Sequence, residues 1–274
     1  MIVYLDTNAF DHIYKKIGCT SADVANLRKA LYGRQLSIRL SLHTLEEILL
    51  GRKVAPQALA AQIKLTLSLA SARMLVKPCA QLLLDDIRAY AARGDADRPY
   101  LLGDAQNAVA DGIAALIESD GEELEEDFVS VLHQARQEKP AFLAALEQAR
   151  HQAQSIAGPR SGWTDFEQYF GAAALPALEA LAEWAGVAAS CGRRGLDGLL
   201  ETKSVRMSLR AALGPGFVND TTDAPESSTL HHLVSAAAVA EAFVSDLAAN
   251  RDLVRMPIEG LSLVTLPAFL QELN

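Results

Sequence analysis

The sequence has few cysteines, few aromatic residues, no dense cluster of basic residues and no long apolar run. Its three cysteines are odd in number and widely spaced: Cys19, Cys79 and Cys191. This spacing excludes a disulfide framework and shows no zinc-binding pattern, so we expect a reducing, cytoplasmic location. No apolar run approaches the length that spans a membrane, and no basic leader precedes one, so we expect no membrane association.

The charge balance is acidic, with a formal net charge of −9 over 274 residues. It gives no sign of the electrostatic footprint that nucleic-acid-binding proteins carry, so contact with a polyanion would need a local patch or bound cations. Half of the residues are hydrophobic and only 6% are aromatic, with Ala and Leu recurring throughout. This composition favours closely packed helices around a small sheet.

Strands are expected only towards the two ends of the chain. Short apolar or alternating runs predict four of them, at residues 2–5, 36–42, 242–245 and 261–265. Residues 73–77 fit either a short strand or a linker. Helical spacing dominates elsewhere and predicts helices that include residues 140–156, 163–185, 202–213, 229–241 and 246–254. Gly214-Pro215-Gly216 is expected to end the helical middle of the chain.

The order of strand, helix and strand at both ends predicts parallel pairing in one sheet. We therefore expect an α/β core made of residues 1–55 and 217–274, with a small parallel sheet flanked by helices. Residues 56–216 are expected to form a large all-helical insertion that packs in part on this core.

The most informative segment is the opening strand, which ends abruptly in Asp6-Thr7-Asn8. Ligands of open α/β sheets bind beyond the carboxyl ends of the strands, where Asp6 would lie. A carboxylate at this place suits a metal or phosphate site. The alternative is that Asp6 only caps the helix that follows.

Three separated segments follow one another in the order typical of a known family. They are Val-Tyr-Leu-Asp-Thr-Asn at residues 3–8, Ser-Leu-His-Thr-Leu-Glu-Glu-Ile at 41–48, and Thr-Leu-His-His-Leu-Val-Ser-Ala at 229–236, followed by Phe-Val-Ser-Asp at 243–246 and Leu-Ser-Leu-Val-Thr-Leu-Pro-Ala-Phe-Leu at 261–270. Together they resemble the PIN domain family, metal-dependent ribonucleases found as toxins of bacterial toxin–antitoxin pairs and in RNA processing. The resemblance covers about residues 1–55 and 217–274 and implies the family's three-layer fold there.

The resemblance implies a site in which three or four carboxylates hold one or two Mg²⁺ or Mn²⁺ ions, hard cations that prefer oxygen ligands. Asp6 matches the central ligand, Glu47 the second acid, and Asp246 would complete a reduced cluster. Thr7, Asn8 and Ser245 match positions that orient water or substrate. The metal would activate water for attack on a phosphodiester.

Within the helix expected near residue 45, the choice between two acids stays open. Leu45, Ile48 and Leu49 share an apolar face, Glu46 lies at its edge, and Glu47 points nearly opposite. Glu47 fits the motif if it faces a cleft. Otherwise Glu46 is the ligand, or both side chains are solvated.

The C-terminal half departs from the family pattern. Thr229 stands where the third acid is expected, and Leu247 where the fourth is expected, with Asp246 one place early. Candidate replacements are Glu241, Glu226, Asp223 and Asp220. The simpler interpretation makes Asp220 and Asp223 turn residues and Asp246 a helix N-cap.

Other polar residues are interpreted as structural. His231 and His232 lie on an Ala-rich helix without a His-x-Glu or cysteine partner, and are expected to be packing or surface residues. The pair Arg193-Arg194 is expected in a solvated loop. The acidic run at residues 122–127 is expected to begin a solvated helix, where the helix dipole favours carboxylates.

The leading functional hypothesis is a PIN-like endoribonuclease, toxin-like in character, with RNA as substrate and an antitoxin as protein partner; self-association into a homo-oligomer is compatible with it. The alternative is a catalytically inactive PIN-like scaffold that uses its helical insertion for protein interaction. A third hypothesis, a phosphohydrolase of the haloacid dehalogenase type, is weaker because Asn8 stands where that chemistry needs a second Asp.

Overall fold

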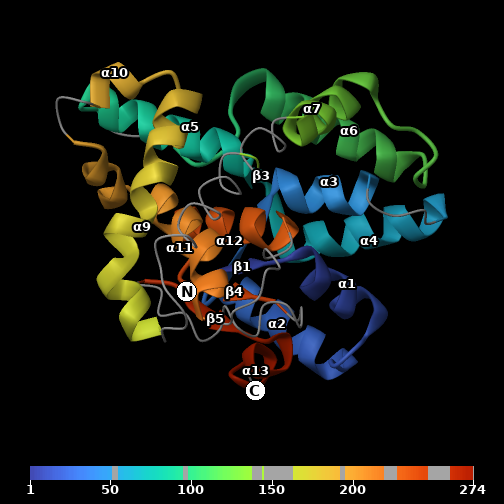
Figure 1. Cartoon of the computed structure of the whole chain (residues 1–274). Helices are drawn as coiled ribbons and strands as arrows, with labels where there is room; N and C mark the ends of the chain where they lie inside the picture. The colour runs from blue at the N-terminus through green and yellow to red at the C-terminus, as the bar shows by residue number, and fades with distance from the viewer. Residues whose placement is uncertain are drawn as a thin grey trace.

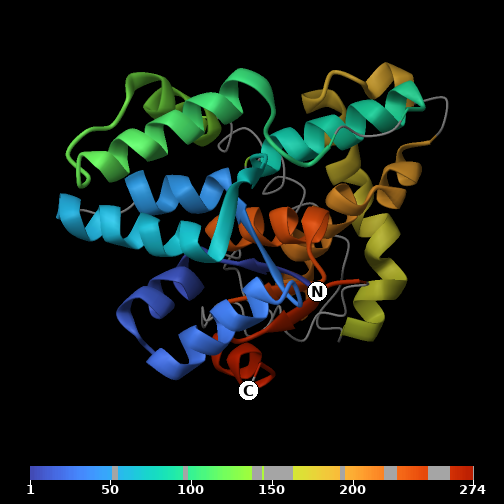
Figure 2. The ribbon, with the colours of Figure 1, turned by 180° about the vertical axis from the view of Figure 1, so that it is seen from behind.

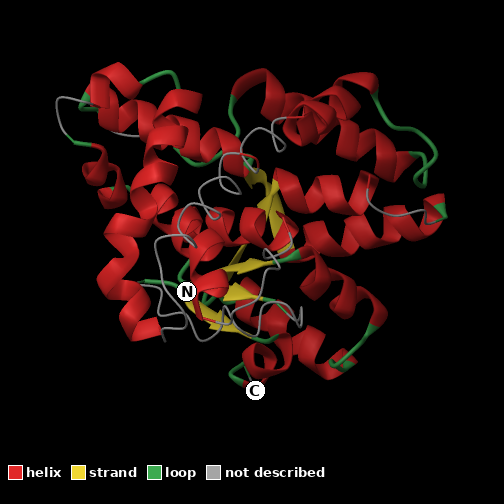
Figure 3. Ribbon diagram, in the orientation of Figure 1, coloured by secondary structure: helices red, strands yellow, loops and turns green. Residues whose placement is uncertain are grey.

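A five-stranded, all-parallel sheet forms the centre of the computed structural model (Figure 3). The model describes residues 1–50, 55–94, 98–137, 144, 163–191, 195–218, 227–245 and 260–273. The strand order is β3-β2-β1-β4-β5, for β1 (Ile2–Leu5), β2 (Ser37–Ser41), β3 (Ala70–Val76), β4 (Ala242–Val244) and β5 (Ser262–Val264). Direct pairing of β1 with β4 confirms the prediction that the two ends of the chain share one sheet.

Helices cover both faces of this sheet (Figure 1). They are α1 (Thr7–Lys15), α2 (Ser21–Tyr32), α3 (Leu42–Leu50), α4 (Pro56–Leu69), α5 (Cys79–Ala92), α6 (Gly103–Glu118), α7 (Glu126–Gln137), α9 (Trp163–Trp184), α10 (Ala188–Cys191), the 3₁₀ helix η1 (Leu196–Glu201), α11 (Lys203–Val218), α12 (Ser227–Val239) and α13 (Leu266–Gln271). Among the described residues, no helix is both long enough and apolar enough to cross a bilayer.

Alternation along the strands divides the interior into two cores, because successive side chains of a strand point to opposite faces. Tyr4 and Phe243 face α12, with α5, α9 and α11 packed beyond it. Val3, Leu5 and Val244 face α1 to α4, α6, α7 and α13. Figure 1 shows α12 in front of the sheet, and Figure 2, from behind, shows α2 in front of it.

The sheet also includes a strand from the middle of the chain. β3, at residues 70–76, pairs with β2, so residues 73–76 belong to a strand and only Lys77 lies beyond it. This strand lies within residues 56–216, so the prediction that this segment is an all-helical insertion is wrong. The central sheet therefore draws on both parts of the sequence.

Gly214-Pro215-Gly216 does not end a helix, so that prediction is wrong. Helix α11 continues through these residues to Val218. Its buried Val205, Leu209 and Leu213 belong to the core shared with α9 and α12. Tertiary packing of a long apolar face outweighs the local cost of glycine and proline.

Several expected features lie outside the described residues. These are the helices at residues 140–156 and 246–254, the pair Arg193-Arg194, and the acids Asp220, Asp223, Glu226 and Asp246 together with Leu247.

Candidate metal centre

The candidate site lies where the direction of the sheet connections reverses. From β1 the chain moves to one side through β2 and β3, and later returns to the other side through β4 and β5. The carboxyl ends of β1 and β4 flank this switch point, which is where open α/β sheets bind ligands. Asp6 follows β1 directly and Ser245 follows β4.

Asp6 is almost fully buried at this point, with 1% of its surface exposed. Its Oδ1 accepts a hydrogen bond from the backbone N–H of Ala9 at 2.7 Å, so it does cap α1, and its Oδ2 accepts one from the Ser245 hydroxyl. Burial raises the pKa of Asp6, while the nearby His232 and these two donors act against that rise. Asp6 therefore joins the ends of β1 and β4 as well as starting a helix.

Glu47 reaches the same place from α3. Its Oε2 accepts a hydrogen bond from the Thr7 hydroxyl and lies 2.9 Å from Nε2 of His232. Its Oε1 lies 3.3 Å from Nε2 of His43, one helical turn earlier. Glu47 thus points towards α1 and α12, opposite the apolar face of its own helix.

Glu46 has a different environment. It is buried, with Oε2 at 3.3 Å from Nδ1 of His43. Of the two acids in α3, Glu47 is therefore the one that meets the segments following β1 and preceding β4.

His232 is held from both sides of its ring. Its Nδ1 lies 2.7 Å from the Tyr4 hydroxyl, which in turn lies 2.6 Å from Oγ of Ser41. Burial raises the pKa of Tyr4, so this phenol stays neutral and acts as a hydrogen-bond partner. The contact at Nδ1 orients the ring so that Nε2 points towards Glu47.

The three imidazoles of this region pack against one another. The His43 ring centroid lies 4.6 Å from that of His232 and 5.0 Å from that of His231. All three histidines are buried. The expectation that His231 and His232 are packing or surface residues is therefore incomplete, because His232 also contacts the carboxylate of Glu47.

His43, Glu47 and His232 form a group that could hold a metal ion. One potential ligand atom from each lies within 4.8 Å of the others. The Glu47 side chain keeps 24% of its surface exposed, so solvent reaches this otherwise buried group. Neutral imidazole nitrogens and a carboxylate oxygen are common ligands of transition metals. The Tyr4 contact to the far nitrogen of His232 is the support that metal-binding histidines usually have.

Some, but not all, of the residues expected at the site lie close together in the structure. Asp6, Thr7, Glu47 and Ser245 converge, although Asp6 is not in the group of three. Asn8 is half-buried in the first turn of α1. Asp246 is outside the described residues.

The positions that depart from the family pattern can also be located. Thr229 lies in α12, nearly one turn before His232. Glu241 is exposed and precedes β4, where its N–H donates to the carbonyl of Ile2. It lies at the amino end of the strands, so it does not replace the missing acid.

His43 and His232 were not expected at the site. A usable signal was present for His43, because residues four apart on a helix share a face and His43 therefore accompanies Glu47. His232 carried no local signal. Its role depends on the pairing of β1 with β4.

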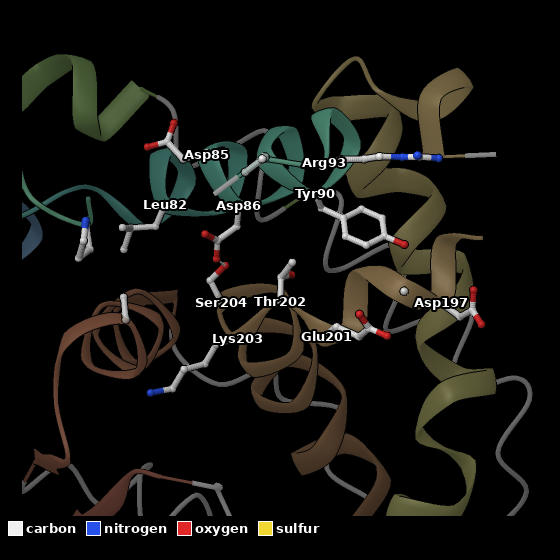
Figure 4. Close-up of a pocket in the computed structure, with 15 residues that line it drawn as sticks. Leu82, Asp85, Asp86, Tyr90, Arg93, Asp197, Glu201, Thr202, Lys203 and Ser204 are labelled. Atoms are coloured by element: carbon white, nitrogen blue, oxygen red, sulfur yellow. Dashed lines mark hydrogen bonds between the residues drawn. The ribbon is translucent and has the colours of Figure 1, made fainter. Parts of the chain in front are cut away.

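A separate cavity of about 880 Å³ lies between α5, η1 and α11 (Figure 4). Two of the carboxylates that line it, Asp85 and Asp86, have partners within the fold. Asp86 accepts a hydrogen bond from Ser204, and Asp85 forms an ion pair with Lys77 at 2.6 Å. Burial raises the pKa of Asp86, which fits a structural position beneath α11.

No protein-family model, curated protein or solved structure matches this chain. Function therefore has to be argued from the residues and their geometry.

Proposed function

We propose that the protein is a PIN-like, divalent-metal-dependent endoribonuclease that hydrolyses phosphodiester bonds. The observation that carries this proposal is the approach of Glu47 to His43 and His232 beside buried Asp6, at the switch point of a parallel sheet. The motif order from Asp6-Thr7-Asn8 through Glu47 to Ser245 supports the PIN-like assignment. The helices between β3 and α12 would then be the insertion into that fold.

His43, Glu47 and His232 would hold the cation. Two imidazoles and one carboxylate are a softer donor set than the oxygen ligands that Mg²⁺ prefers, so Mn²⁺ fits better than Mg²⁺. A bound divalent cation would lower the pKa of a coordinated water and neutralise charge on the phosphate.

The neighbouring residues of the chain would organise this chemistry. Thr7 orients the Glu47 carboxylate through its hydroxyl, and Tyr4 orients His232 through Nδ1. Asp6 places a further carboxylate close enough to His232 and Glu47 to interact with both electrostatically. These groups come from β1, α1, α3 and α12, elements that form or pack on the sheet.

The test is cleavage of single-stranded RNA in the presence of Mn²⁺ or Mg²⁺. We expect Asp6→Asn, Glu47→Gln and His232→Asn each to reduce the rate at least 100-fold. Asp111→Asn and Glu118→Gln, exposed acids of α6, serve as matched controls and should leave the rate unchanged. Activity that survives in the three site variants would rule out this site as its source.

The second candidate is a catalytically inactive PIN-like scaffold whose helical insertion binds a protein. It is favoured by Thr229 at an expected acidic position and by hydrogen bonds to both oxygens of Asp6. Thermal unfolding with and without Mn²⁺ separates the two. A ligand at 100 times its Kd stabilises the native state by about 2.7 kcal/mol, or roughly 5 °C or more. A scaffold without a metal site would show no shift.

A further inference from the structure

A groove between α1, α2 and α4 lies outside the candidate metal centre. These three helices lie together on the left of Figure 2. The groove has a volume of about 970 Å³. Its lining combines apolar side chains with three cations and two tyrosines, among them Ile13, Val24, Leu65, Lys16, Arg28, Lys29, Tyr14 and Tyr32.

The surface in and around the groove is locally basic, although the chain is acidic overall. Five exposed cations lie between residues 15 and 34: Lys15, Lys16, Arg28, Lys29 and Arg34. The only acids between residues 10 and 36 are Asp11 and Asp23. Asp11 pairs with Lys15 at 2.9 Å, and Asp23 completes the capping box of α2. An acidic chain therefore presents a positive surface at this groove.

Aromatic side chains stand among these cations. Tyr32 is 85% exposed, and Tyr14 is partly exposed at the end of α1. Proteins that bind single strands combine a positively charged groove with aromatic rings on which bases stack. An exposed tyrosine ring in a cationic groove matches that pattern.

We propose that this groove binds a single-stranded RNA segment through its phosphates and one stacked base. The choice of RNA rests on the proposed function. Helix α1 links the two places, because it begins at Thr7 beside Glu47 and is followed by Lys16 in the groove. Nine helical residues span about 13 Å, so the groove lies a short distance from the centre for a strand that contacts both.

An acidic peptide is the competing occupant. It would use the same cations but has no base to stack on Tyr32, whose ring remains largely exposed. The alternation of cations and rings therefore favours a nucleic-acid strand.

The test measures binding of a fluorescein-labelled, mixed-sequence 12-nucleotide RNA by anisotropy. Asp6→Asn protein in EDTA is used throughout, so cleavage does not interfere. Into this background we add the triple variant Lys16→Gln, Arg28→Gln, Lys29→Gln. Its control removes three exposed cations elsewhere, in Arg88→Gln, Arg98→Gln, Arg136→Gln.

We expect the groove variant to bind at least tenfold more weakly and the control to bind within twofold of the parent. The slope of log K against log salt should become shallower by about 2, since each phosphate contact contributes about 0.7. Tyr32→Ala should weaken binding about tenfold, whereas Tyr32→Phe keeps the ring and should not.

Equal binding by the groove variant and its control would overturn the proposal. So would competition by poly-glutamate as effective as that by unlabelled RNA of equal charge, which would indicate an acidic peptide. Binding is measured without metal, so a failure of the nuclease proposal would show in the cleavage assay and leave this result intact.

Discussion

Asp6 has two opposing effects on stability: its hydrogen bonds stabilise the fold, and the burial of its charge destabilises it. As the N-cap of α1 and the partner of Ser245 it holds the ends of two strands, yet its carboxylate is buried. Burial disfavours the charged form and raises the pKa. Groups that reduce stability in this way are common at functional sites, where activity and stability compete.

We predict that Asp6→Asn, measured in EDTA at pH 7, raises the midpoint of thermal unfolding. Asparagine caps helices as well as aspartate does and carries no charge to desolvate. The midpoint should rise by about 2–4 °C for each kcal/mol of burial cost that is removed.

The stabilisation by Asp6→Asn is expected to be smaller at lower pH. Because the native pKa of Asp6 is raised, the native state binds a proton more readily than the unfolded state. The contribution of Asp6 to wild-type stability therefore increases as pH falls through its raised native pKa, and the advantage of Asp6→Asn shrinks. Scanning calorimetry at pH 7 and pH 5 measures this, with Asp111→Asn as the exposed control. An advantage that grows at pH 5 would contradict it.

A second prediction concerns His232. If the proposed site binds metal, we expect His232→Asn to abolish the thermal shift caused by millimolar Mn²⁺, because it removes one of the three groups that could hold the ion. In EDTA the variant should lose about 1–3 kcal/mol, since the buried hydroxyl of Tyr4 loses one of its hydrogen-bond partners and keeps Ser41 and Thr44.

The matched control for His232→Asn is His133→Asn, on an exposed position of α7. It should keep both the stability and the Mn²⁺ shift of the wild type. A full Mn²⁺ shift in His232→Asn would place any metal elsewhere.

Among the elements, those with a regular apolar period were predictable. The alternation of Leu36, Ile38 and Leu40 gave β2 its buried face, and the run at Ile2–Leu5 gave β1. These patterns report which face of an element is buried. They carry no information on which distant element will cover that face.

The residues of the candidate site differ in the same way: those in local motifs could be predicted, and those that depend on long-range contacts could not. Asp6 and Glu47 could be proposed from motifs at strand and helix positions. His232 could not, because its contact with Glu47 joins residues 185 apart in the chain. Only the pairing of β4 with β1 brings α12 over the end of β1.

Close helix packing gives a prediction at the scale of elements. A Cβ added to Gly112 of α6 would lie 2.3 Å from the Cβ of buried Phe128 in α7. Gly112→Ala should therefore force these helices apart and cost about 1–3 kcal/mol. Chemical denaturation measures the loss.

Gly171→Ala in α9 is the control for Gly112→Ala. Apart from the chain neighbours and backbone of its own helix, no atom of the described residues lies within 4 Å of the Cβ that it would add. Alanine in a helix is favoured over glycine by about 0.5–1 kcal/mol, so this variant should be stabilised. Equal effects of the two substitutions would show that α6 and α7 do not pack as described.

At the scale of the whole molecule, one hydrophobic core lies on each face of the sheet, and the strands contribute side chains to both. Tyr4 and Phe243 belong to the core that contains α5, α9 and α11, while Val3 and Val244 belong to the other. Each strand thus contributes to both cores through alternate side chains. The described helices of the middle segment therefore share their core with both ends of the chain.

This arrangement predicts a single cooperative unfolding transition. Leu178→Ala in α9 removes a fully buried side chain and should cost about 2–5 kcal/mol. Because α9 shares its core with Tyr4, the whole transition should move to lower temperature without splitting. Scanning calorimetry, comparing calorimetric and van't Hoff enthalpies, measures this.

The matched control is Leu175→Ala on the same helix, where the side chain is 44% exposed. Its effect should stay within about 0.5 kcal/mol. A separate early transition in Leu178→Ala would show that the helical segment unfolds as an independent domain.

The long chain separation between Glu47 and His232 has a consequence during synthesis. A ribosome adds about 5–20 residues per second, so the 185 residues between these two side chains take roughly 10–40 s to make. Throughout that interval a nascent chain carries Asp6 and Glu47 without their imidazole partner from α12. Translation itself therefore delays assembly of this candidate cation-binding group, and the nuclease proposed above would stay harmless to its own messenger until the chain is nearly complete.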